Sequence, residues 1–211
     1  MEGKMLYSGK DLRKLIIPLI IEQILAIAVG MADTIMVSAA GEAAVSGVSL
    51  VDTVNILLIN VFSALATGGA VVSGHFLGKK KREDACKSAW QILLFATLLA
   101  CVISVIFITA HDPLLRLMFG KIEDDVMKAS KTYLIITTYS FVALAIYNSC
   151  AALFRAMNES KVTMWVSLLM NVINVVGNAI CIYGLHMGVA GVAIPTTISR
   201  YVAAVVIFLL M

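Results

Sequence analysis

The sequence predicts an all-α integral membrane protein with six transmembrane helices. Hydrophobic residues make up 61% of the 211 residues and charged residues only 14%, and the mean hydropathy is +0.97. Soluble domains contain about 45–50% apolar and about 25% charged residues, so this composition indicates a chain that lies largely within a bilayer. Six apolar runs are each long enough to cross about 30 Å of hydrocarbon as a helix.

The six runs follow one another with polar links between them. The expected helices span about residues 15–38, 49–77, 88–110, 132–154, 162–185 and 189–211, after a polar arm over 1–14. The longest link, 111–131, carries apolar residues at near-helical spacing, which predicts a short amphipathic helix in the membrane interface.

Lysine and arginine residues orient this bundle. The polar arm and the links after the second and fourth runs together hold eleven of them, whereas the 111–131 segment holds four. Basic residues favour the cytoplasmic side of a bilayer. We therefore expect a multi-pass protein of the cell membrane, in contact with lipid on its outer faces, with both termini in the cytoplasm.

The first run carries Glu22, Gln23 and Asp33 within an apolar sequence. Glu22 and Asp33 are eleven residues apart, so at about 100° per residue they return to within roughly 20° of the same helix face. A carboxylate within hydrocarbon normally faces a protein interior or a watery cavity. We expect Asp33 to lie in such a cavity as the only fully buried acid, with Glu22 and Gln23 as secondary cavity residues. The alternative is a capping position for Asp33 at the outer interface.

The fifth and sixth runs also carry polar residues on single faces. Asn171, Asn174 and Asn178 are three and four residues apart, and Thr196 and Arg200 are four apart. A single such asparagine can be an interhelical hydrogen bond worth about 1 kcal/mol. A stripe of three, together with Asp33 and Arg200, predicts a polar cavity within the bundle.

The second run begins with polar residues as well, among them Asp52 and Asn55. Polar groups at membrane depth must be paired or must face water. Arg200 in particular should face the bundle, within reach of polar groups on the first or fifth run, because an unpaired guanidinium at mid-depth costs at least about 2.5–3.5 kcal/mol.

The sequence lacks the patterns of an enzyme. It has no GxSxG nucleophile motif, no HExxH zinc motif and no P-loop. The four cysteines have neither metal-binding nor disulfide spacing. The KKKRED link fits a cytoplasmic anchor beside anionic lipid. We expect no enzymatic activity, no cofactor, no firm metal site and no nucleic-acid partner.

Four segments resemble the multidrug and toxic compound extrusion (MATE) family. They are GMADTIMVSAAGEAAVSGVSL, ATGGAVVSGHFLGKKKREDA, FRAMNESKVT and NVINVVGNAICIYGLHMGVAGVAIPTTISR. They occur in the order of the family and extend the resemblance over essentially the whole chain. Each motif is weak alone, and the last segment is the most specific.

The resemblance implies a cation-coupled exporter with about twelve helices in two lobes. Residues 1–211 would be the N-terminal six-helix lobe, and the C-terminal lobe would be missing. Family members export organic cations and drugs in exchange for H⁺ or Na⁺. The family's coupling residues fall on Asp33, Asn174, Asn178 and Thr196, which could also hold Na⁺. Asn178 stands where relatives often have Asp, and this loss of a charge favours H⁺.

Two other functions remain open from the sequence. A flippase for lipid-linked precursors, from the same superfamily, would need a more cationic cavity than Arg200 alone supplies. A membrane scaffold without transport activity is the second. The last run ends in VVIFLLM without a polar exit, so we expect the chain to be the front part of a longer protein.

Overall fold

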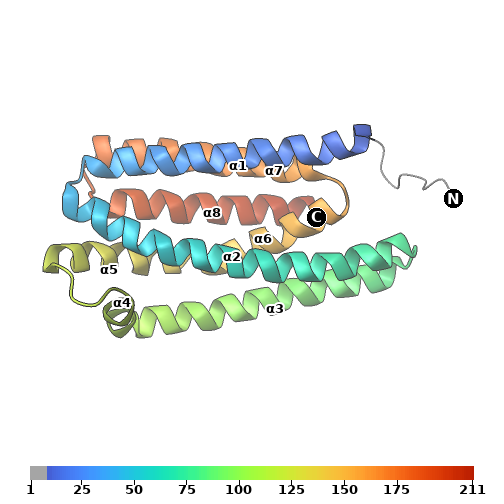
Figure 1. Cartoon of the computed structure of the whole chain (residues 1–211), viewed down its shortest axis with the longest axis horizontal. Coiled ribbons are helices and arrows are strands. Elements are labelled where there is room, and N and C mark those ends of the chain that lie inside the picture. Colours follow the sequence, from blue (N-terminus) through green and yellow to red (C-terminus); the bar gives the residue numbers. More distant parts are fainter. Residues whose placement is uncertain (1–8) are drawn as a thin grey trace.

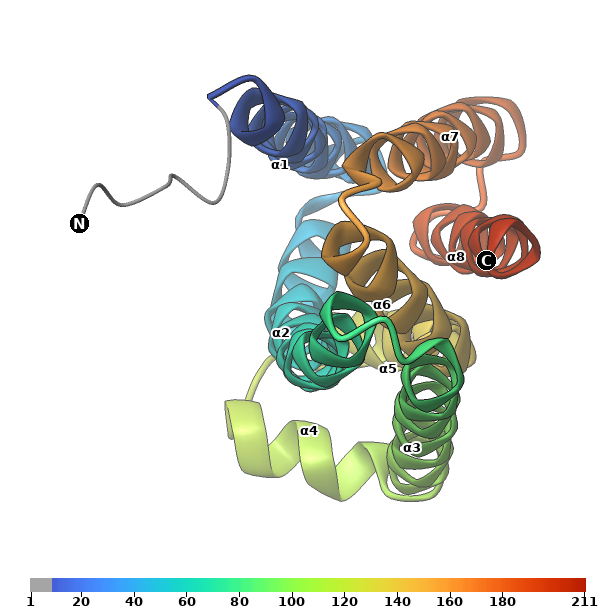
Figure 2. The ribbon, with the colours of Figure 1, turned by 90° about the vertical axis from the view of Figure 1, so that its right-hand side faces the viewer.

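The computed structural model describes residues 9–211, and it is helical with no strands over this range. The elements are α1 (Gly9–Ser38), α2 (Glu42–Gly78), α3 (Arg82–Thr109), α4 (His111–Phe119), α5 (Asp124–Thr138), α6 (Phe141–Ala156), α7 (Ser160–Ala179), η1 (Ile180–Gly184) and α8 (Ala190–Leu210). Most of them are long helices that run side by side, while the short α4 turns across the end of α3 (Figures 1 and 2). The predicted all-α fold is confirmed.

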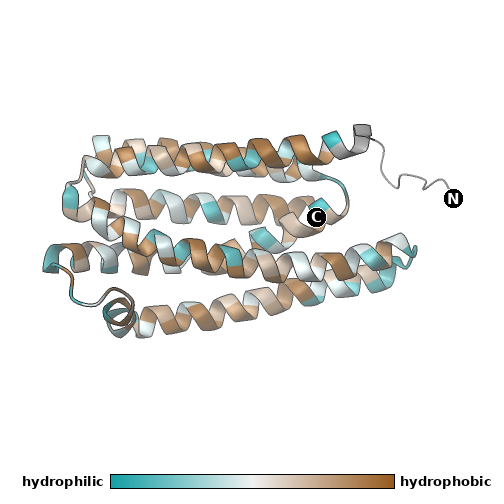
Figure 3. Ribbon diagram, in the orientation of Figure 1, coloured by the Kyte–Doolittle hydropathy of each residue, from teal (hydrophilic) through white to brown (hydrophobic). Residues whose placement is uncertain are grey.

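The spanning segments also agree with the expected number. Five helices are long and apolar enough to cross a membrane, and α5 and α6, which meet at a bend of 52°, give a sixth when the pair is counted as one broken span. Large apolar side chains such as Ile24, Ile27 and Leu98 are exposed on the outer faces, and hydrophobic residues colour every long helix in Figure 3. These faces suit contact with lipid.

Helix α6 occupies the centre of the bundle. It packs against α2, α3 and α8, while α7 lies between α1 and α8 (Figure 2). The contacts of α6 with α2 and α3 rest on small residues, including Ala96, Ala100 and Ala145, around the fully buried Phe62 and Phe141. Small side chains let helix backbones approach closely where no hydrophobic effect from water drives association.

Several helices start earlier than the hydropathy indicated. α1 begins at Gly9 and not at 15, α2 at Glu42 and not at 49, and α3 at Arg82 and not at 88. Acidic residues in the first turns of α2 and α3 interact favourably with the helix dipole, so these charged turns are helical although they are not apolar. The rest of the polar arm, residues 1–8, lies outside the described residues.

The fourth expected helix, 132–154, is broken in the structure. Its chain bends between Thr138 and Phe141. Just before the bend, Thr137 and Thr138 donate hydrogen bonds to carbonyl oxygens of their own helix, and Ser140 donates to the Thr137 carbonyl at 2.6 Å. Hydroxyl side chains of this kind compete with the backbone ladder and bend helices. Because the run 132–154 is apolar in composition, its hydropathy predicted one continuous helix and not a break.

The other boundaries follow the sequence more closely. The fifth expected helix comprises α7 and the π-helical turn η1, and α8 runs to Leu210. The amphipathic helix expected within 111–131 is α4, which ends at Gly120 with a φ of 68°. Glycine adopts this left-handed conformation without strain, which stops the helix there.

Candidate functional site

Asp33 lies where α1 meets α7, next to the asparagine stripe. The Asn178 amide nitrogen donates a hydrogen bond to Asp33 Oδ1 over 2.6 Å. Asn178 is fully buried, and Asp33 is half-buried. The structure therefore brings the acid of the first span to the amide of the fifth, as the predicted cavity requires.

The Asn174 amide links Asp33 to Thr196 on α8. One orientation has its nitrogen donating to Thr196 Oγ1 over 2.9 Å, which leaves the amide oxygen facing the carboxylate. The opposite orientation places the nitrogen 2.9 Å from Asp33 Oδ1 and lets the oxygen accept from Thr196. We adopt the second for ionised Asp33, because a carboxylate can only accept hydrogen bonds. The four predicted coupling residues thus form one connected group.

A close approach of two helices holds this group together. An ideal Cβ atom on Gly177 would lie 2.6 Å from the Cβ of Pro195, so α7 and α8 touch almost backbone to backbone there. Thr196 follows Pro195 directly, and its hydroxyl lies 2.8 Å from the Val192 carbonyl, to which it donates when it accepts from the Asn174 nitrogen. Because Gly177 carries no side chain, Asn174 can reach Thr196.

A second acid lies near this group. Asp52 of α2 accepts hydrogen bonds from Asn55 over 3.2 Å and from the Tyr133 hydroxyl of α5 over 3.0 Å. The negative charge of Asp52 acts unfavourably on ionised Asp33. Since both acids are only half-buried, the expectation that Asp33 is the only fully buried acid is wrong.

Arg200 faces the bundle as expected, but its partner is neither on the first nor on the fifth span. Its Nη1 donates to Ser140 Oγ over 2.9 Å, at the break between α5 and α6. Arg200 attracts both Asp33 and Asp52 electrostatically, but no carboxylate lies within 4.0 Å of it among residues 9–211. The break in the helix thus places a hydroxyl where the buried guanidinium needs an acceptor.

Only some of these additional site residues could be predicted from the sequence. Asp52 and Asn55 were visible as polar residues in an apolar run. Tyr133 and Ser140 carried no signal, because an aromatic ring or a single hydroxyl is ordinary in a membrane span.

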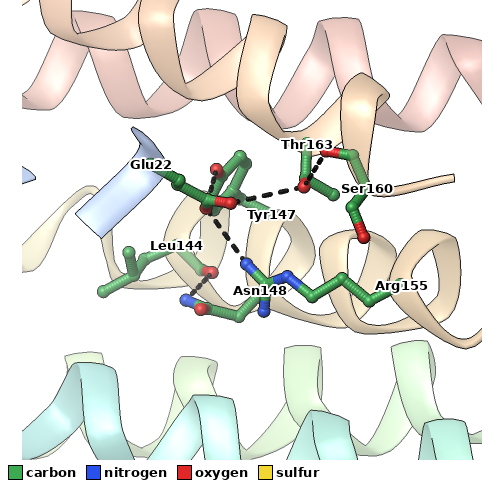
Figure 4. Close-up of polar contacts among 7 residues, drawn as sticks. All are labelled: Glu22, Leu144, Tyr147, Asn148, Arg155, Ser160 and Thr163. Carbon is green, nitrogen blue, oxygen red and sulfur yellow. Dashed lines mark hydrogen bonds and ion pairs between the residues drawn. The ribbon is translucent and has the colours of Figure 1, made fainter. Parts of the chain in front are cut away.

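The secondary cavity residues lie apart from Asp33. Glu22 is 7% exposed and accepts hydrogen bonds from Arg155 over 3.0 Å, Thr163 over 3.3 Å and Tyr147 over 3.4 Å (Figure 4). Glu22 and Asp33 do share the face of α1 that packs on α7, since Thr163 and Asn178 both belong to α7. Gln23 is exposed.

Asn171 is buried on the asparagine stripe, but its amide nitrogen has no partner within residues 9–211. The same range contains no cluster of three or more His, Cys, Asp or Glu residues that could hold a metal ion. The arrangement as a whole supplies two half-buried carboxylates, one guanidinium and several neutral oxygens. Such a group can bind a proton or a monovalent cation.

The model of the MatE family matches residues 18–180. The chain belongs to the MatE family. Its relatives are named as transporters and not as enzymes, in agreement with the lack of catalytic motifs.

Two relatives illustrate the range of similarity. The uncharacterized transporter YisQ of Bacillus subtilis is 32% identical over 193 residues, which cover 89% of this chain and 42% of YisQ. A probable multidrug resistance protein NorM of Thermotoga maritima is 28% identical over 202 residues, or 92% of this chain and 42% of NorM. The chain therefore spans less than half the length of these relatives.

The chain also matches less than half of each of two solved transporter structures. The chain matches a multidrug resistance MATE family transporter of the MOP superfamily in its outward-facing conformation with a TM-score of 0.87 and 25% identity, over 94% of this chain and 44% of that one. A MOP superfamily transporter from Pyrococcus furiosus, whose binding pocket is described as having reverse polarity, gives the same TM-score over 43% of its length. The chain has the fold of one lobe of these larger transporters.

Proposed function

We propose that this chain forms the N-terminal lobe of a secondary-active exporter that moves organic cations or drugs out of the cell in exchange for H⁺. The observation that carries the proposal is the 2.6 Å hydrogen bond from Asn178 to Asp33 within a membrane-spanning lobe. A partly buried acid held by helices that must move relative to one another is suited to coupling ion binding to alternating access. A second lobe, formed by further chain, would complete the cavity.

The hydrogen bonds around Asp33 favour a proton over Na⁺. Asn178 points its amide nitrogen at the carboxylate, and the adopted orientation of Asn174 does the same. Na⁺ would need the oxygen atoms of both amides to face the carboxylate, whereas a proton needs only the Asn174 amide to turn. Protonated Asp33 could instead donate to the Asn174 oxygen, and the Asn174 nitrogen would then donate to Thr196 over 2.9 Å. Rotation of the Asn174 amide would thus couple the protonation of Asp33 in α1 to the hydrogen bonding of Thr196 in α8.

The charge of the polar group around Asp33 argues against a flippase for lipid-linked precursors. Such a substrate carries phosphate groups and calls for cationic side chains. This lobe supplies Arg200 but sets two carboxylates, Asp33 and Asp52, near it. The balance suits a cationic substrate better than an anionic one.

The test uses the complete gene product in inverted membrane vesicles, with ethidium as the organic cation and an imposed pH gradient. Asp33→Asn should reduce gradient-driven ethidium transport to the level of vesicles without the protein, while its amount in the membrane stays unchanged. The matched control is Asp84→Asn, an acid at the first turn of α3 whose side chain is 45% exposed. Unchanged transport in Asp33→Asn would show that Asp33 does not couple ion movement to export. Transport by the unaltered protein that requires Na⁺ would overturn the preference for H⁺.

The orientation in the cell membrane is part of the proposal. A reporter fused after Lys81, in the turn between α2 and α3, should behave as cytoplasmic, and one at Lys121, between α4 and α5, as external. The reverse pattern would place both termini outside the cytoplasm and refute the orientation.

A further inference from the structure

Asp52 has a free acceptor that Asp33 lacks. Both hydrogen bonds to Asp52, from Asn55 and from Tyr133, go to the same oxygen, Oδ1. Oδ2 receives no hydrogen bond from residues 9–211 and is not among the buried unpaired atoms of that range. In ionised Asp33, by contrast, the amides of Asn174 and Asn178 supply donors to the carboxylate. Asp52 therefore keeps one carboxylate oxygen open to a ligand.

The charge near Asp52 is not neutralised by a close ion pair. Arg200 is the cation that acts on it, but the Arg200 guanidinium makes its hydrogen bond to Ser140. No ion pair within 4.0 Å involves Asp52 in the described part of the chain. With Asp33 and Asp52 ionised, the group formed by these two acids and Arg200 has a net charge of −1, so it has room for one further positive charge.

Asn55 supplies an independent sign of a missing ligand. Its side chain is 2% exposed, and its Oδ1 is buried without a partner among the described residues. The Asn55 nitrogen points at Asp52, which fixes the amide orientation and commits the oxygen to an acceptor role. A buried acceptor without a donor or cation is costly, so native structures usually fill such positions.

We propose that Asp52, Asn55 and Tyr133 form a second cation subsite in this lobe, separate from the Asp33 group, for a monovalent cation. The ligand chemistry is that of an ammonium group on a transported amine or of an alkali ion, because one carboxylate and two neutral oxygens carry too little charge for a divalent metal. The subsite joins α2 to α5, whereas the Asp33 group joins α1, α7 and α8. In this proposal Asp33 binds the coupling ion, and Asp52 binds the second positive charge.

This subsite rests on the proposed transport function for its role, but its occupancy can be measured without transport. The complete gene product is purified in detergent with 3-fluorotyrosine in place of tyrosine, and the ¹⁹F resonance of residue 133 is identified by its absence in Tyr133→Phe. Methylammonium chloride, sodium chloride and tetramethylammonium chloride are titrated separately at constant pH. Tetramethylammonium has no N–H donor and serves as the control for ionic strength.

The expected result is a saturable shift of the residue-133 resonance with methylammonium or with Na⁺, but not with tetramethylammonium. A response to methylammonium alone assigns the subsite to a substrate amine, and a response to Na⁺ alone assigns it to an alkali ion. The shift should persist in Asp33→Asn and in the control Asp84→Asn, and it should vanish in Asp52→Asn.

Two results would overturn the subsite. One is the absence of a saturable shift with methylammonium and Na⁺, and the other is the same shift in Asp52→Asn as in the unaltered protein. If Asp52 only linked α2 to α5, Asp52→Asn would lower the stability of the protein. The unaltered protein would then show no cation-dependent shift of the residue-133 resonance. Since the titration does not measure export, it can succeed or fail independently of the Asp33→Asn transport test.

Discussion

Glu22 of α1 and Arg155 of α6 form an ion pair of 3.0 Å that joins the first span to the central helix. The side chain of Glu22 is 10% exposed and that of Arg155 is 29% exposed. Tyr147 and Thr163 add hydrogen bonds to the carboxylate (Figure 4). Because Thr163 belongs to α7, this network fixes α1 against two helices at once.

Removal of one partner of this ion pair should be more harmful than removal of both. Arg155→Met leaves the buried Glu22 carboxylate without its cation, which should destabilise the protein by about 3 kcal/mol, at the lower end of the range for broken buried pairs because Arg155 is partly exposed. Adding Glu22→Gln should restore much of the loss. Thermal unfolding in detergent of the two single variants and the double variant tests this coupling. Additive effects of the two substitutions would show that the ion pair contributes nothing.

Gly177→Ala should disturb the junction of α7 and α8. The added Cβ would meet the Cβ of Pro195 at 2.6 Å, closer than carbon atoms pack, so the helices must separate. Overpacking of this kind costs about 1–3 kcal/mol. The unfolding temperature of the variant should fall, whereas Gly30→Ala in α1, where nothing lies within 4 Å of the new atom, should leave it unchanged or raise it. Equal effects of the two substitutions would contradict the close approach.

The sequence predicted the spans and the main polar group because both depend on local patterns. Hydropathy identifies each apolar run, and the spacing of Asn174, Asn178 and Thr196 places their side chains on helix faces that must avoid lipid. The Asp33 group therefore follows from helical periodicity together with the cost of a polar group in hydrocarbon.

The break at Ser140 and the partners of Glu22 and Arg200 depend on tertiary structure. Hydropathy averages over Thr137, Thr138 and Ser140 and gives one continuous helix over 132–154. In the sequence Arg155 falls in an expected polar link, where a basic residue is explained by orientation alone, although the structure places it in the last turn of α6. Its ion pair with Glu22 therefore has no sequence signal. Asp52 was visible as a polar residue, but its contact with Tyr133, 81 positions away, was not.

The contact of α4 with α5 should depend on pH at the membrane surface. Lys131 of α5 lies 2.6 Å from Asp112 of α4, and this hydrogen bond lowers the pKa of the Asp112 carboxyl below its ordinary value of 3.8. A lowered pKa means that the contact contributes stability above pH 3.8 and loses it as the pH falls through the lower value in the folded protein. An NMR titration of the Asp112 carboxyl carbon should show a midpoint below 3.8 that rises in Lys131→Met. Since about half of the Asp112 side chain is exposed (49%), added salt should also raise this midpoint. If the titration midpoint of Asp112 were the same in Lys131→Met as in the unaltered protein, Lys131 would not be the cause of the lowered pKa.

Asn178→Asp should change the ion requirement of transport. The new carboxylate would take the place of an amide nitrogen that lies 2.6 Å from Asp33 Oδ1, and two carboxylates at this distance cannot both stay ionised without a proton or a cation between them. Because Na⁺ binds oxygen ligands and the variant offers two charged ones, export by the complete gene product should gain Na⁺ dependence. Export measured against NaCl at fixed pH should rise several-fold in the variant. Asn171→Asp is the matched control, since it adds an acid to the same buried stripe away from Asp33 and should not produce this response. A Na⁺ response in both variants would mean that added charge anywhere on the stripe suffices, and no response in Asn178→Asp would mean that Asp33 does not hold the coupling ion at this position.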